Sequence, residues 1–188
     1  MSPTRIEALA DAIGLANGID LPDSKAYQLR NPGLLRSFSL VRHQETDDCG
    51  VRIFTSFIGG YRALVHDLTT RCQGLSRATV WNSGKPEKLR SDSQLRDLLR
   101  TYGMKIDDPI IKIVKFLRVA LRDESIGATS LIKVFVMNDG QLTLLRQQEE
   151  VKHEAEANAT WLGLSLTTRV LQPADQMKDA DWRGLGEK

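Results

Sequence analysis

The sequence predicts a mainly α protein, of class α+β, with one small β-hairpin. Apolar residues recur at intervals of three and four in four separate stretches, which is the spacing of one face of a helix. Residues that typically cap or end helices stand at the borders of these stretches. Alternating apolar residues, the pattern of a half-buried strand, occur in residues 37–54.

The first helix is expected over residues 4–16. Thr4 is a suitable N-cap, and Glu7 three residues later completes a capping box. Gly18 ends the helix because glycine adopts the left-handed conformation that a helix C-terminus often requires. The apolar stripe consists of Ile6, Leu9, Ala10, Ile13 and Ala16.

Residues 19–36 are expected to form a loop. Pro22 and Pro32 each disfavour the helical conformation of the preceding residue, and Asn31–Gly33 has the composition of a turn. The hairpin follows over residues 37–54, where Phe38 and Leu40 would pair with Val51 and Ile53 across a long polar tip.

Three more helices follow from the periodicity. One spans residues 56–73, with Ser56 as its cap and Gly74 as its end. A second opens at Ser91 and Asp92 and carries Leu95, Leu98, Leu99 and Tyr102. A third opens at Asp107, Asp108 and Pro109, because proline is tolerated in the first helical turn.

The segment around Asn138 and Asp139 has two interpretations. Asn-Asp-Gly between short apolar runs is compatible with a hairpin, whereas the following residues, rich in Leu, Arg, Gln and Glu, favour a helix. We expect the helix. Residues 1–158 are therefore assigned to one folded domain, and residues 159–188 to a partly flexible C-terminal extension.

Composition excludes several classes of protein. A hydrophobic share of 41% and a charged share of 27% are ordinary for a folded protein and argue against global disorder. No stretch approaches the ~20 apolar residues of a membrane span, and the N-terminus does not resemble a secretory signal, so we expect synthesis in the cytoplasm. A net charge of +2 makes nucleic acid an unlikely partner, although 26 Lys and Arg residues could still cluster on one face.

Cysteines and histidines give no motif. Cys49 and Cys72 match no metal-binding spacing; we expect free thiols, and whether the two pair is left open. His43, His66 and His153 match no zinc motif. We therefore expect neither a metal nor a cofactor.

The order of helix, loop with Asn-Pro-Gly, hairpin and long helix resembles the lysozyme-like domains of bacteriophage endolysins and virion-associated muramidases, which carry an E-G-x-x-x-P…N-P-G-N-L pattern. The resemblance covers roughly residues 5–158. The residues that match the two parts of the family pattern are Gly18, Pro22, Asn31, Pro32, Gly33 and Leu34 or Leu35, followed by Gly50, Val51, Phe54, Ser56, Gly60, Ala63 and Leu64.

The resemblance implies a lysozyme-like fold, but the residue that performs the family's chemistry differs. In these enzymes a glutamate immediately before the glycine at the end of the first helix protonates the glycosidic oxygen. Here that position is Asn17. An amide can hydrogen-bond to the oxygen but has no proton to deliver. Asparagine at this position could therefore lower the rate of glycoside hydrolysis by ~10²–10⁴-fold.

Two carboxylates are candidate substitutes for the missing acid. Glu45 lies on the predicted hairpin tip and Asp20 lies close to Asn17 in the sequence. The competing interpretations are a solvated tip for Glu45 and a turn-forming role before Pro22 for Asp20. Asn17 itself is either a helix cap or a remnant sugar-binding residue, and the two roles are compatible.

The remaining candidates are binding residues. Together with Asn17, the expected cleft would be lined by Arg30, Asn31, Gly33 and Tyr61. Arginines that flank it could contact carboxylates of peptidoglycan peptides or could simply lie on the surface. The expected partner is a peptidoglycan glycan strand or another protein.

Three functions remain open, and whether the protein is an enzyme is left undecided. We expect a catalytically degenerate lysozyme-like domain that binds peptidoglycan or acts as a structural component of phage or prophage type, virion-associated or released by lysis. The alternative is an active muramidase, a glycoside hydrolase or lytic transglycosylase that uses another carboxylate such as Glu45. The third is a regulatory or nucleic-acid-binding module that shares only the fold.

Overall fold

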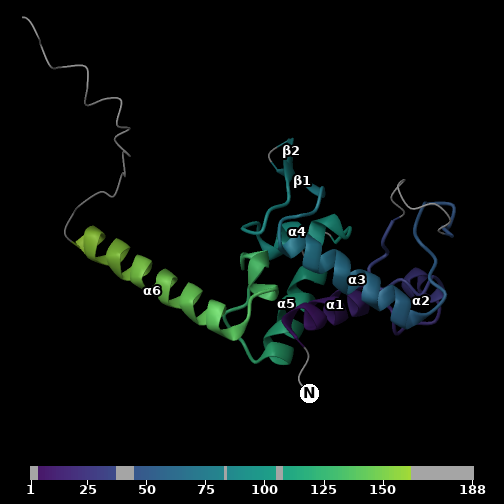
Figure 1. Ribbon diagram of the computed structural model, residues 1–188, viewed down its shortest axis with the longest axis horizontal. Coiled ribbons are helices and arrows are strands. Elements are labelled where there is room, and N and C mark those ends of the chain that lie inside the picture. The colour runs from purple at the N-terminus through teal and green to yellow at the C-terminus, as the bar shows by residue number, and fades with distance from the viewer. Residues whose placement is uncertain (1–3, 37–44, 83, 105–107, 162–188) are drawn as a thin grey trace, which may run out of the picture. The chain divides into compact units, whose positions relative to one another are not determined.

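The computed structural model describes residues 4–36, 45–82, 84–104 and 108–161 (Figure 1). It is mainly helical with one small two-stranded antiparallel sheet, which confirms the predicted fold class. The contacts divide the chain into two units, Met1–Gly140 and Gln141–Lys188. The predicted domain boundary at residue 158 lies further along the chain, and residues 162–188 of the predicted extension lie outside the described residues.

The first helix, α1 (Arg5–Ala16), has the predicted borders. Thr4 is the N-cap and forms the capping box with Glu7, whose carboxylate accepts a 2.8 Å hydrogen bond from the Thr4 backbone N–H. These hydrogen bonds lower the pKa of Glu7, the backbone one most strongly. Asn17 is the C-cap, and Gly18 follows in the left-handed conformation with φ 78°.

The predicted loop over residues 19–36 contains one short helix, α2 (Lys25–Gln28), that the periodicity did not indicate. Four residues are too few to show a helical repeat. The Ser24 hydroxyl caps it by accepting a hydrogen bond from the Tyr27 backbone N–H. The long helix α3 (Phe57–Cys72) then begins after Ser56, as predicted, and Gly74 follows its end with φ 73°.

The structure describes a β-hairpin at residues 79–88, where none was predicted. Strands β1 (Thr79–Asn82) and β2 (Lys85–Lys88) pair antiparallel. In the region of the predicted hairpin, Phe38 and Leu40 lie outside the described residues, and the described part contains only the single bridges Arg36–Val51 and Thr46–Arg52.

The second half of the unit contains α4 (Leu95–Thr101), α5 (Asp108–Leu121) and the short 3-10 helix η1 (Ile132–Phe135). Helix α4 begins later than predicted because its first backbone N–H groups bind carbonyls of another segment: Leu95 donates to Ser130 at 2.8 Å and Arg96 donates to Ala128 at 2.9 Å. These bonds satisfy donors that a capping side chain would otherwise satisfy.

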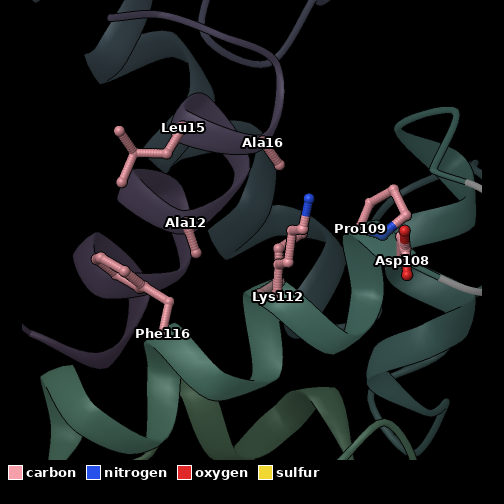
Figure 2. Close-up of a pocket in the computed structure, with 8 residues that line it drawn as sticks. Ala12, Leu15, Ala16, Asp108, Pro109, Lys112 and Phe116 are labelled. Atoms are coloured by element: carbon pink, nitrogen blue, oxygen red, sulfur yellow. The ribbon is translucent and has the colours of Figure 1, made fainter.

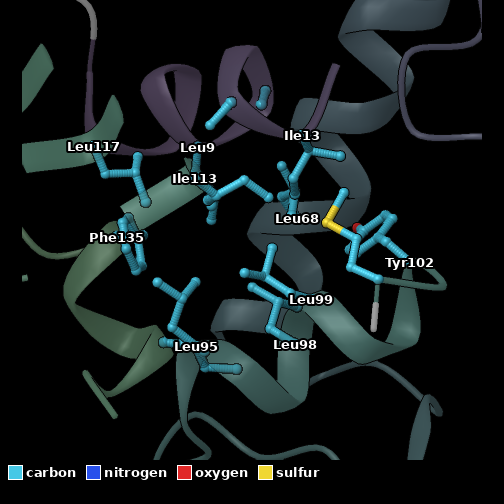
Figure 3. Close-up of a cluster of buried hydrophobic side chains, with 14 of the residues drawn as sticks. Leu9, Ile13, Leu68, Leu95, Leu98, Leu99, Tyr102, Ile113, Leu117 and Phe135 are labelled. Atoms are coloured by element: carbon cyan, nitrogen blue, oxygen red, sulfur yellow. The ribbon is translucent and has the colours of Figure 1, made fainter. Parts of the chain in front are cut away.

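The hydrophobic core of this unit lies among α1, α3, α4, α5 and η1 (Figure 3). Helix α1 is central because it packs against α5, α3 and η1. Small residues on α1, such as Ala8, Ala10 and Ala12, are buried and let its neighbours approach closely. The largest fully buried side chains include Leu9, Ile13, Leu64, Leu68, Leu98, Leu99, Ile113, Leu117 and Phe135.

Helix α6 (Asp139–Trp161) begins two residues before the second unit, and its residues 141–161 make up the described part of that unit. The helix predicted from Asn138 or Asp139 therefore forms, and the competing hairpin does not. Lys152 and His153 each lie within 4 Å of the Glu156 carboxylate, on a face exposed to solvent. None of the described helices combines the length and the apolar character needed to cross a membrane.

A close backbone contact in the first unit gives a test of the packing. A Cβ atom added at Gly60 of α3 would lie 1.9 Å from the carbonyl oxygen of Arg30, whereas one at Gly59 would meet nothing closer than the Ser56 hydroxyl at 3.2 Å. We predict that Gly60→Ala lowers the free energy of unfolding by about 3 kcal/mol, because the backbone must move.

The neighbouring substitution Gly59→Ala is the matched control and should change the stability by less than about 1 kcal/mol. Urea unfolding of both variants measures the difference. Equal stabilities for the two variants would show that the approach of α3 to Arg30 is not a constraint on the fold.

Candidate functional site

The C-terminal end of α1 forms one wall of a pocket of about 710 Å³, which we call the Asn17 pocket. Its other walls come from the Asn31–Arg36 loop, from residues 49–51, and from the ends of α3 and α4. The described residues that line it are Asn17, Lys25, Gly33, Leu34, Leu35, Arg36, Cys49, Val51, Arg71, Arg100, Thr101, Tyr102 and Gly103. Of the residues predicted to bind a ligand, Asn17 and Gly33 therefore line this pocket.

Asn17 acts as a helix cap and as a wall of the pocket at once. Its backbone N–H donates to the Ile13 carbonyl at 3.0 Å, which ends α1. Its side-chain Nδ2 donates to the Pro32 carbonyl at 2.8 Å. Among the described residues, Asn17 Oδ1 has no hydrogen-bond partner, so the amide can still accept a hydrogen bond.

Asn31 holds the loop that carries Pro32 and Gly33. Its Nδ2 donates to the carbonyls of Leu35 at 3.0 Å and Arg52 at 2.8 Å, and its Oδ1 accepts from the Leu35 N–H at 2.9 Å. The residue is 0% exposed. The prediction that Asn31 binds a ligand is therefore corrected. Its side-chain amide makes three hydrogen bonds to the backbone of the protein and positions the pocket wall.

Of two other predicted binding residues, Gly33 and Arg30, only Gly33 is among the described residues that line the Asn17 pocket. Gly33 lines the pocket, and a Cβ atom there would lie 2.6 Å from Leu64 Cδ1, so a larger residue would require the Leu64 side chain to shift. Arg30 is exposed and donates from Nη1 to the Phe54 carbonyl at 3.2 Å, and it is not among the described residues that line the pocket.

Tyr61 lies in a second pocket, of about 620 Å³, between α1 and α3. Its hydroxyl donates to the Glu7 carbonyl at 3.3 Å, and burial raises its pKa. Tyr61 and Asn17 therefore do not line one pocket, contrary to the predicted set.

A third pocket, of about 340 Å³, lies between α1 and α5 (Figure 2). Ala12, Leu15 and Phe116 give it mainly apolar walls, and Lys112 extends toward Ala16. Among the described residues that line it, the one acid is Asp108, which lies at the start of α5 beside Pro109. A single carboxylate and a lysine on apolar walls do not form the carboxylate pair that glycoside hydrolysis uses.

The Asn17 pocket is lined by cations and, within the described residues, by no Asp or Glu. The cations are Lys25, Arg36, Arg71 and Arg100. Three of them bind carboxylates that do not line the pocket: Lys25 binds Asp47, Arg71 binds Asp67 and Arg100 binds Asp97. The acids thus hold the cations in place without facing the pocket.

Asp47 orders the wall that contains Cys49 and Val51. Its Oδ1 accepts hydrogen bonds from the backbone N–H groups of Cys49 at 2.9 Å and Val51 at 2.7 Å. The hydrogen bond from Lys25 is the main cause of its lowered pKa, and the backbone bonds lower it further. Asp47 therefore joins this turn to α2.

Arg71 lines the Asn17 pocket and is a candidate site residue that the sequence prediction did not name. It is 8% exposed, and its guanidinium donates from Nε to Asp67 and from Nη1 to the Thr101 hydroxyl, both at 2.7 Å. The guanidinium carbon lies 4.7 Å from the ring centre of Tyr102, which itself donates to Asp67 at 2.5 Å. Burial and the nearby Asp67 raise the pKa of Tyr102.

The sequence contains a signal for the cluster that Arg71 forms with Asp67, Thr101 and Tyr102. Gly60, Leu64, Leu68 and Arg71 follow the spacing of the buried face of α3, so Arg71 falls where an apolar residue is expected. Asp67 precedes it by four residues, the spacing of a helical ion pair. A charge on a buried face with a partner one turn away indicates a structured polar cluster.

The predicted substitute acids lie elsewhere. Glu45 and Asp20 are both exposed, and neither belongs to the described lining of the Asn17 pocket. The two cysteines are both free: Cys49 is exposed, and Cys72 is buried in the core, where burial raises its pKa to about 12. His43 lies outside the described residues, and within the described part no group of three or more His, Cys, Asp or Glu side chains is arranged to hold a metal.

Comparisons of the chain with protein-family models, with curated proteins and with solved structures find no match.

The roles of the two asparagines can be separated by stability. We predict that Asn31→Ala lowers the free energy of unfolding by about 3 kcal/mol or more, because it leaves one N–H and two carbonyls without their partner in a buried site. Asn17→Ala removes one partly exposed hydrogen bond and should cost about 1 kcal/mol. Urea unfolding of the two variants measures both values, and the reverse order would contradict the assignment of Asn31 as the structural residue.

Proposed function

We propose that this chain is a lysozyme-like domain that binds a peptidoglycan glycan strand in the Asn17 pocket without cleaving it. The observation that carries the proposal is that the pocket at the end of α1 has, within its described lining, an asparagine where the resembling enzymes have their acid and no other carboxylate. The pocket has a volume within the range of small-molecule binding sites.

Glycoside hydrolysis needs groups that this pocket lacks. In most glycosidases two carboxyl groups flank the scissile bond, one of them protonated to serve the leaving oxygen. Asn17 keeps a free acceptor for a sugar hydroxyl but cannot deliver a proton. The lining therefore supports hydrogen bonding to a saccharide more than bond cleavage.

The walls are also suited to a sugar ring. Leu34, Leu35 and Val51 provide apolar surface, and Thr101 provides a polar group beside them. Binding sites for small ligands commonly combine apolar walls with a few polar groups that fix orientation. The alternative of an active muramidase is less well supported, because Glu45 and Asp20 are exposed and neither is in the described lining.

The proposal predicts binding without turnover. Purified protein mixed with purified peptidoglycan sacculi should sediment with them, and the supernatant should contain no released muropeptides. Robust release by the unmodified protein, lost in Glu45→Gln, would show instead that the domain is an active muramidase with a different acid. Failure to sediment with sacculi would remove the proposed ligand.

Restoring the acid is the sharper test. We predict that Asn17→Glu produces measurable muropeptide release, at least about 10²-fold above the unmodified protein, because general acid catalysis contributes at least that factor. A protonated glutamate at residue 17 can still donate to the Pro32 carbonyl, as the Asn17 amide does, whereas an ionised one cannot.

Asn17→Gln is the matched control, since it has the length of glutamate and no acidic proton. It should remain inactive. Activity in both variants would mean that side-chain length, and not acid chemistry, limits the reaction. A folded Asn17→Glu variant that binds sacculi and releases nothing would mean that a single acid at residue 17 is not sufficient, either because the glycosidic oxygen does not reach it or because the second carboxylate that most glycosidases use is missing.

A further inference from the structure

We infer that Arg71 is a receptor for a carboxylate in the Asn17 pocket, so that the domain selects an acidic glycan over a neutral one. The inference rests on the proposed function and names the ligand chemistry that the pocket recognises. Peptidoglycan offers such carboxylates on the lactyl group of its muramic acid and on its stem peptides.

The first support is the way in which Arg71 is held. Three contacts fix its guanidinium: the Asp67 carboxylate, the Thr101 hydroxyl and the face of the Tyr102 ring. They come from α3, from α4 and from the residue that ends α4. These three contacts fix the position of the Arg71 side chain at the pocket before a ligand binds.

The second support is that Arg71 has hydrogen-bond donors without a partner among the described residues. A guanidinium has five N–H donors, and the contacts above use one on Nε and one on Nη1. The other three, two of them on Nη2, have no partner among the described residues. Arg71 lines the pocket, and we assign these remaining donors to a ligand there. A carboxylate is the group that a guanidinium binds most strongly in proteins, together with phosphate.

The third support is the charge of the surroundings. Four cations line the pocket and three carboxylates bind to them from outside its lining, so positive charge is in excess and the surface that faces a ligand carries no described carboxylate. A neutral sugar gains nothing from this field, whereas an acidic sugar is attracted by it.

The arrangement favours one carboxylate over a phosphate polymer. Polyanions are bound by rows of exposed Lys and Arg along an extended surface. Here the cations line a single pocket, and one of them, Arg71, is nearly buried and already shares Asp67 with Tyr102. One small anionic group fits this geometry.

The decisive experiment needs no variant. Isothermal titration calorimetry measures the affinity of the unmodified protein for three probes: N,N′-diacetylchitobiose, which is neutral, the disaccharide of N-acetylglucosamine and N-acetylmuramic acid, and the methyl ester of that acidic disaccharide. We expect the free acid to bind about tenfold more tightly than the ester and than chitobiose. Equal affinities for acid and ester, with no tighter binding of the same disaccharide carrying its stem peptide, would overturn the inference.

The source of the carboxylate is separated by a fourth probe, the same disaccharide with its stem peptide attached, in which the lactyl group is an amide. Tight binding of this probe assigns the carboxylate to the peptide, and tight binding of the free acid alone assigns it to the lactyl group. A single-stranded DNA oligonucleotide that binds more tightly than any of the saccharides would overturn the inference in favour of a phosphate ligand.

Variants then test Arg71 itself. Arg71→Gln should bind acid and ester equally, and Arg71→Lys should retain part of the preference because it keeps the charge but loses the planar donor array. Arg62→Gln is the matched control: Arg62 is an exposed arginine on the same helix outside the described lining of the Asn17 pocket, and the variant should keep the tenfold preference. Circular dichroism establishes whether each variant is folded. If Arg71→Gln does not fold, Arg71→Lys still tests the role of the guanidinium.

Failure of the inference and failure of the proposed function give different results. If sacculi and all four saccharides fail to bind, the proposed function falls. If acid, ester, chitobiose and the stem-peptide probe all bind alike, glycan binding stands and the role of Arg71 falls. A preference for the acid that persists in folded Arg71→Gln would also overturn the assignment to this residue.

Discussion

The buried side-chain amide of Asn31 is the interaction on which the architecture of the pocket depends. By binding Leu35 and Arg52 it joins two segments that are distant in sequence, and it fixes the turn that presents Pro32 and Gly33. Asn17 then binds the Pro32 carbonyl, and Leu64 of α3 packs against Gly33. An amide suits this position because it both donates and accepts, which neither a carboxylate nor an ammonium group can do in its charged form.

The helices could be predicted from the sequence because their signals are local. The capping box at Thr4, the cap at Ser56 and the glycines that follow α1 and α3 act within a few residues of themselves. The hairpin could not be located in this way. All four residues of β2 are exposed, so the strand lacks the apolar alternation that identifies a half-buried strand. The start of α4 depends on carbonyls of residues 128 and 130, which no local pattern reveals.

The candidate site was predictable in part. Asn17 and Gly33 line the pocket because the turn between them is encoded by nearby glycine and proline residues. Arg71 was missed, although its position on the buried face of α3 and its partner Asp67 are visible in the sequence. Its place at the pocket also depends on Thr101 and Tyr102, thirty residues further along, and this tertiary contact has no sequence signature. Tyr61 and Arg30 were expected at the same site because the resemblance fixes order along the chain and not the direction of side chains.

The contacts that hold Arg71 also bear on the entropy of association. A free arginine side chain samples many rotamers, and immobilising it costs about 1.5–2 kcal/mol. Here Asp67, Thr101 and Tyr102 restrict those rotamers before any ligand arrives. The ordering cost is therefore met during folding, and a ligand that reaches the guanidinium finds a preorganised partner. Weakly binding saccharides, which have little binding energy to spare, are the ligands for which such rigidity matters most.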